Sequence, residues 1–73
     1  MKYIVEMMPE HSEKKFYLTD DNEYFWNFCA QIESAIRFDT RMQGWQRIAD
    51  IIEESISLGV KDENYYRVIG VKE

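Results

Sequence analysis

The sequence has little of the residues that staple or interrupt a chain: among 73 residues there are one cysteine, Cys29, one proline, Pro9, and three glycines. A single thiol excludes an internal disulfide, so packing alone must hold the fold, as is usual in a reducing compartment. No apolar run approaches the ~20 residues of a membrane span, and the first residues lack the apolar core of a signal peptide. The sequence therefore predicts one domain, residues 1–73, that stays in the cytoplasm where it is made.

Positive charge is also scarce. Nine Lys and Arg residues stand against 14 Asp and Glu residues, for a net charge of −5 at pH 7. Nucleic acids and anionic membranes repel such a surface, which argues against direct binding to either. A basic protein partner is attracted to it instead. The alternative is that the acidic balance only supports solubility.

Sequence motifs of the common enzyme classes are missing. The chain has no Walker-type glycine loop, no G-x-S-x-G elbow and no H-E-x-x-H pair. His11 has Glu10 and Glu13 nearby, but a metal site there would need more ligands than the neighbourhood supplies. Cys29 has no adjacent His or Lys to activate its thiol. We therefore predict a protein that is not an enzyme, with no catalytic residue, no metal and no cofactor.

Hydrophobic periodicity indicates a mixed fold. The segments 2–8, KYIVEMM, and 14–19, KKFYLT, have the composition of strands, and the short turn between them favours an antiparallel hairpin. The segment 65–72, YYRVIGVK, closes the chain as a third strand. Two helical segments lie between. The pattern predicts an α+β fold of order ββααβ, a small three-stranded antiparallel sheet with both helices on one face.

The two expected helices each have a start signal. Asp20 and Glu23 form a capping box for the first helix. Asp39 or Thr40 caps the second, and Gly44 weakens its first turn, so this helix could begin after Gly44. Apolar residues at helical spacing predict the buried stripes. They are Phe25, Phe28, Cys29, Ile32, Ala35 and Ile36 in the first helix, and Trp45, Ile48, Ala49, Ile52 and Ile56 in the second. Gly59 fits the position after the second helix, where a positive φ costs glycine nothing.

Aromatic and methionine residues exceed what such a small core can bury. Aromatics make up 15% of the chain, and Tyr, Trp and Met are enriched at the centres of protein interfaces. A small sheet also has edges that can accept an extended peptide. The alternative is that the rings only complete a cramped core. We predict a partner-binding surface made of Tyr3, Glu6, Met7, Tyr17, Trp26 and Tyr66.

Two stretches carry a resemblance to a known family: MKYIVEMMPEHSEKKFYLTDDNEYFWNF and the closing YYRVIGVKE. In a chain of this length they resemble the small RNA-polymerase-binding transcription regulators of lytic Xanthomonas phages. The resemblance spans the whole chain but includes no signature motif. It implies a non-enzymatic protein of the host bacterial cytoplasm that binds the N-terminus of the polymerase β′ subunit, near the β flap and the RNA exit channel. There it would disturb the hold of σ region 4 on the flap, inhibit initiation and promote antitermination.

Other classes of protein remain open from the residues alone. An acidic inhibitor of a host nuclease that imitates DNA would carry its carboxylates on one continuous face, although a net charge of −5 is modest for that role. An antitoxin or an immunity-type inhibitor of a toxin would be equally acidic and small. A small-molecule enzyme or a metal protein would need a deep polar pocket or a bound metal.

Overall fold

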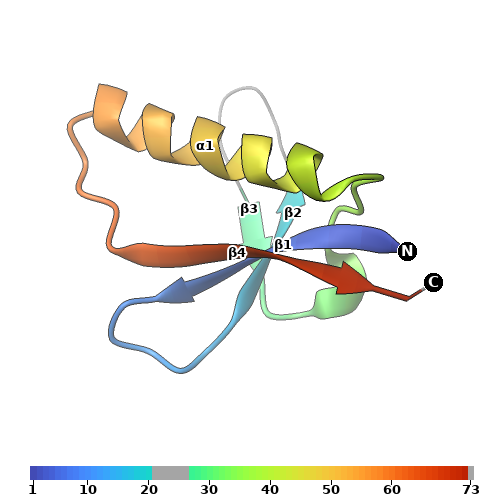
Figure 1. Ribbon diagram of the computed structural model, residues 1–73. Helices are drawn as coiled ribbons and strands as arrows, with labels where there is room; N and C mark the ends of the chain where they lie inside the picture. The colour runs from blue at the N-terminus through green and yellow to red at the C-terminus, as the bar shows by residue number, and fades with distance from the viewer. Residues whose placement is uncertain (21–26, 73) are drawn as a thin grey trace.

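The computed structural model describes residues 1–20 and 27–72, and it has a twisted antiparallel sheet with an α-helix across one face (Figure 1). The elements follow in the order β1 (Lys2–Pro9), β2 (Phe16–Asp20), β3 (Asn27–Cys29), a 3₁₀ turn η1 (Ile32–Ser34), α1 (Arg41–Ser57) and β4 (Asn64–Val71). The α+β class is as expected. The expected order ββααβ, with three strands and two helices, is wrong, because the described residues contain four strands and one α-helix.

The strands lie in the order β3-β2-β1-β4, so the N-terminal strand β1 is an inner strand and the C-terminal strand β4 lies beside it at the edge of the sheet. β1 and β4 pair along their whole length, from Lys2↔Val71 to Pro9↔Asn64. The predicted hairpin of β1 and β2 is present, but it pairs only where Met7 faces Phe16 and at the next position. Beyond that point the two strands diverge. The segment before α1 enters the gap, where Phe38 and Tyr3 exchange backbone hydrogen bonds of 2.8 and 2.9 Å.

The first expected helix is absent from the part of its range that the structure describes. Phe28 and Cys29 lie in β3, opposite Leu18 and Tyr17 of β2, and only a single 3₁₀ turn follows. Aromatic residues suit a sheet at least as well as a helix, so the backbone hydrogen bonds offered by β2 decide the structure. Asp20 is the last residue of β2, and Glu23 and Phe25 lie outside the described residues.

The second expected helix is confirmed, with its start signal. Thr40 is the N-cap: its hydroxyl accepts from the backbone N–H of Gln43, and the Gln43 side chain accepts from the backbone N–H of Thr40. This capping box satisfies donors that the first turn of a helix leaves free. Gly59 follows the helix with a φ of 70°, as expected. The helix begins at Arg41, directly after the Thr40 cap, so the alternative start after Gly44 is wrong.

The stripe of α1 that faces the sheet differs from the expected one. Gly44, Ile48 and Ile51 are buried, whereas Trp45, Ile52 and Ile56 expose 47%, 39% and 73% of their surface. Of the expected stripe, only Ile48 is buried. The reason is Gly44. A Cβ at this position would lie 2.9 Å from Val68 Cγ2 in β4, so the missing side chain lets the helix approach the strand.

The core lies between α1 and the sheet. Its buried cluster consists of Val5, Leu18, Phe38, Ile48 and Val68. Ile4 lies on the opposite side of β1 and is also fully buried. No helix among the described residues is long and apolar enough to cross a membrane.

Candidate protein-binding surfaces

Strand alternation divides the predicted partner-binding residues between the two faces of the sheet. Tyr3, Met7 and Tyr66 share the face that carries Val5 and Val68, which is the face covered by α1. Glu6 and Tyr17 are cross-strand neighbours on the opposite face, which we call the open face. Trp26 lies outside the described residues. The structure therefore does not bring the six residues together as one surface.

The two tyrosines on the covered face are engaged within the domain. The ring of Tyr3 lies under the Arg41 guanidinium, with 5.1 Å between the guanidinium carbon and the ring centroid. The Tyr66 hydroxyl donates a 2.7 Å hydrogen bond to Asp62 Oδ2, and its ring centroid lies 6.3 Å from that of Phe28. Burial raises the pKa of Tyr66 above its ordinary value, and the hydrogen bond to Asp62 raises it further. Both rings therefore stabilise the fold.

The open face is organised around a buried carboxylate. Glu6 is only 5% exposed and lies on the central strand β1 between Tyr17 of β2 and Arg67 of β4. Arg67 Nε donates a 2.6 Å hydrogen bond to Glu6 Oε1. Desolvation raises the pKa of Tyr17, and the negative charge and hydrogen-bond acceptor of Glu6 raise it further. The three side chains form a polar line across three strands, in which the charge of Glu6 is compensated.

A groove of about 310 Å³ runs beside this polar line. Tyr65 exposes 58% of its surface there, and Met8 supplies a second apolar wall. The full lining consists of Glu6, Met8, Lys15, Tyr65, Tyr66 and Arg67. Of these, only Glu6 and Tyr66 are among the six predicted site residues. The period of two assigns Met8 to the same face as Glu6 in KYIVEMM, and Tyr65 to the same face as Arg67 in YYRVIGVK. These two pairs form one site only through the register between the strands, which the sequence pattern does not give.

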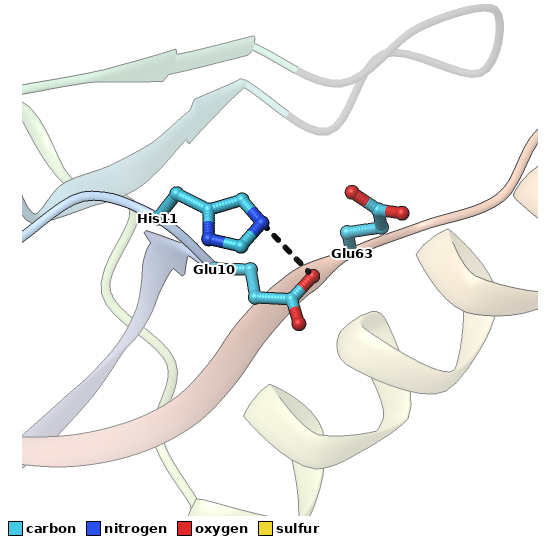
Figure 2. Close-up of side chains that lie close together, drawn as sticks. All are labelled: Glu10, His11 and Glu63. Atoms are coloured by element: carbon cyan, nitrogen blue, oxygen red, sulfur yellow. Dashed lines mark ion pairs between the residues drawn. The ribbon is translucent and has the colours of Figure 1, made fainter.

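Tyr65 also borders a second depression, which we call the acidic end. It is lined by Glu10, Lys61, Asp62, Glu63 and Asn64. Figure 2 shows Glu10, His11 and Glu63 turned toward one another, and the potential ligand atoms of the three side chains lie within 4.8 Å of one another.

This cluster differs from the one that the sequence suggested, because Glu63 joins it in place of Glu13. His11 Nε2 lies 3.9 Å from Glu10 Oε2, and all three side chains are exposed. The Lys61 ammonium lies 3.2 Å from Glu63 Oε1 and already partners that carboxylate. We assign no metal to the cluster. Its two carboxylates are instead suited to attract a cationic group of a partner.

Cys29 is half-buried in β3, and its Sγ lies 3.4 Å from the Gln31 carbonyl oxygen. Glu53 and Glu54 are exposed on α1. Neither site brings together a nucleophile and a base, so both fit the structural interpretation better than a catalytic one.

A second candidate surface lies on α1. Apolar residues at intervals of three and four form a line along the side of the helix that does not face the sheet. The members of this outer stripe are Met42, Trp45, Ala49, Ile52 and Ile56. All five are exposed, and Met42 and Ile56 expose 78% and 73% of their surface. Exposed apolar residues in a continuous line, unlike scattered ones, mark an interaction surface.

Comparisons with known proteins gave no match: no protein-family model, no curated protein and no solved structure is similar to the chain.

Proposed function

We propose that this domain is a phage-encoded, non-enzymatic protein that binds host bacterial RNA polymerase. The proposed site on the polymerase is the N-terminus of the β′ subunit, near the β flap and the RNA exit channel. By binding there, the domain inhibits σ-dependent initiation at promoters and promotes antitermination. The resemblance of the sequence to small phage transcription regulators motivates the choice of partner.

The observation that carries the binding proposal is the groove on the open face. Its walls at Met8 and Tyr65 are apolar, and its floor holds the compensated pair of Glu6 and Arg67. An apolar groove with a few fixed polar groups is the usual form of a recognition site. Tyr65 presents a large, rigid surface that loses little conformational entropy when a partner covers it.

The acidic end indicates the charge of the segment that the groove accepts. An extended polypeptide can place an apolar side chain between Met8 and Tyr65 and a lysine or arginine beside Glu10 and Glu63. The net charge of −5 steers such a basic segment toward the domain. A domain attached near the β flap then acts by occupying space and by competing with σ region 4, and it needs no chemistry of its own.

The proposal is tested with purified domain and purified polymerase. A pull-down recovers the polymerase with the wild-type domain, and transcription from a promoter that depends on a −35 contact falls as the domain is added. Tyr65→Ala removes the exposed wall of the groove, and Glu63→Lys reverses the charge at its end. Each weakens binding by about tenfold or more, and the Glu63→Lys effect shrinks at high salt.

Ser57→Glu is the matched control. It changes an exposed residue at the end of α1, away from the groove, and leaves polymerase binding unchanged. Circular dichroism of each variant checks that the fold is kept. If the wild-type domain fails to bind polymerase and instead captures a nuclease or a toxin, the proposed function is wrong. If polymerase binding is lost equally in Ser57→Glu, the groove is the wrong site.

A further inference from the structure

The outer stripe of α1 lies beside the free edge of the sheet. β4 is the last strand in the sheet order, with β1 as its only described neighbour. α1 packs over β4 and β1 and runs antiparallel to β4 (Figure 1). In α1, Trp45 and Ala49 of the outer stripe each come one position after a buried residue, Gly44 or Ile48. The right-handed turn of the helix therefore directs them outward above β4. Arg41 begins this flank, and its Nη1 lies 3.4 Å from the Val68 carbonyl oxygen of β4.

The apolar flank of α1 and the unpaired edge of β4 lie on the same side of the domain. The same two features of a second copy are complementary to them. If a second copy is related by a two-fold axis at this edge, its β4 pairs antiparallel with the first β4. The two helices then lie on the same side of one continuous sheet, with their flanks facing each other. Each outer stripe covers the other.

The size and the distribution of polar groups favour a second copy. From the exposed fractions of the outer stripe, each chain offers roughly 500 Å² of apolar side-chain surface. Complete burial of both stripes removes at most about 1,000 Å², which is close to the lower limit for a specific interface, and strand pairing adds to it. The outer stripe carries no charged residue. Asp50, Glu53 and Glu54 line a depression on the helix, and of these Glu53 borders the stripe, four residues after Ala49 and three before Ile56.

The charges along β4 also agree with antiparallel pairing. Asp62 and Glu63 precede the strand, and Lys72 follows it. Antiparallel pairing places the acidic start of one β4 near Lys72 of the second copy, at both ends of the interface. The contact of Arg41 with the Val68 carbonyl is long for a hydrogen bond, and a carbonyl oxygen can accept a second donor.

We propose that the chain forms a two-fold symmetric dimer in which β4 pairs with β4 of a second copy and the outer stripes of the two α1 helices pack together. This interface is separate from the walls and floor of the groove on the open face, and it shares only Glu63 with the acidic end. Tyr65 and the Glu6–Arg67 pair stay accessible in both copies, because they lie on the face of the sheet opposite to the helices.

The test is sedimentation equilibrium of the purified chain between about 5 and 500 µM, a range set by the small interface. The wild-type chain shifts from monomer to dimer within this range. Ile56→Glu places a charge in the apolar interface and raises the dissociation constant about 30-fold or more. Ser57→Glu adds the same charge one residue further along the same helix end, outside the stripe, and still dimerises. Both positions are exposed, so both variants fold.

Hydrogen exchange tests the strand pairing. Raising the concentration slows the exchange of β4 amides in the wild-type chain but not in Ile56→Glu. A wild-type chain that is monomeric up to 500 µM overturns the proposal, and so does a dimer that survives in Ile56→Glu. Concentration-independent exchange in β4 overturns the strand pairing. Polymerase binding by monomeric Ile56→Glu shows separately whether the proposed function holds.

Discussion

Replacing Gly44 by alanine tests the contact that sets the orientation of α1. Two effects oppose each other. Alanine favours a helix interior over glycine by about 1 kcal/mol. The new methyl group, however, would lie 2.9 Å from Val68 Cγ2 and 3.0 Å from Val68 Cγ1, closer than carbon atoms can approach. Val68 is branched at Cβ and only 5% exposed, so its methyl groups cannot turn away without disturbing the core.

The steric cost exceeds the gain in helix propensity. Forcing an additional carbon into a packed core costs about 1–3 kcal/mol. Subtracting the propensity gain leaves a net loss of about 1 kcal/mol for Gly44→Ala, or ~4–8 °C in melting temperature for a domain of this size. Urea denaturation followed by circular dichroism measures this loss at one fixed protein concentration. At Glu54, an exposed position of the same helix outside the outer stripe, the difference between Glu54→Ala and Glu54→Gly measures the propensity alone and should be about 1 kcal/mol.

A double-mutant cycle separates the two effects. Val68→Ala removes both methyl groups that the new Cβ would meet. In that background Gly44→Ala should stabilise the domain by about 1 kcal/mol, so the substitution reverses its sign. If Gly44→Ala stabilises the wild-type domain, or if its effect is the same in both backgrounds, the close approach of α1 to β4 does not decide which face of the helix is buried.

Three further predictions concern the open face, the helix start and the pH dependence. Arg67→Ala leaves the carboxylate of Glu6, which is 5% exposed, without its cationic partner, and it should lower the free energy of unfolding by about 1–3 kcal/mol in urea denaturation. The control is Lys61→Ala, which removes an exposed ion pair and should change the free energy of unfolding by less than about 0.5 kcal/mol. Thr40→Ala removes the N-cap of α1 and should cost about 1 kcal/mol, and Thr40→Ser, which keeps the hydroxyl, should restore most of it in the same assay. The pKa of Tyr66 is raised above 10.0 in the folded state, so the unfolded chain loses this proton first and stability should fall as the pH rises above 10. Tyr66→Phe should make that fall smaller in thermal melts at pH 9 to 12, and an unchanged fall would show that the hydroxyl does not contribute.

Local signals in the sequence predicted several elements well. The strands at both ends are visible in the composition of KYIVEMM and YYRVIGVK, and the hairpin in the short turn between KYIVEMM and KKFYLT, because strand propensity and turn chemistry act over a few residues. The capping box at Thr40 and the glycine after α1 are equally local. They place the ends of the helix, whichever way its faces are turned.

The first expected helix shows where local signals fail. Phe28 and Ile32 have helical spacing, yet Phe28 pairs with Leu18 in the sheet. Periodicity over such a short stretch fits both structures, and the choice depends on whether a partner strand is near. The backbone donors and acceptors of β2 are satisfied by β3 and by Ile36, whose N–H donates to the Leu18 carbonyl. A sequence pattern does not show which backbone groups of a neighbouring strand need a hydrogen-bond partner.

The candidate sites depended still more on long-range contacts. The sequence predicted more aromatic and methionine residues than the core can bury. Tyr65 is exposed, and Trp45 and Ile56 are exposed too, although the sequence placed both in the buried stripe. It did not indicate which ones. Both stripes of α1 have helical spacing, and only the approach of Gly44 to Val68 selects the buried one. Met8, Tyr65 and Arg67 became a groove only when β1 and β4 paired in register.

The sequence by itself determined the α+β class, the strands at the two ends, the limits of α1 and the acidic charge, because each follows from composition or from neighbours along the chain. Tertiary structure decided the fate of residues 27–36, the buried face of α1 and the residues of the open-face groove. The physical reason is that hydrogen-bond partners across strands, and the space beside a glycine, are supplied by residues far away in the sequence.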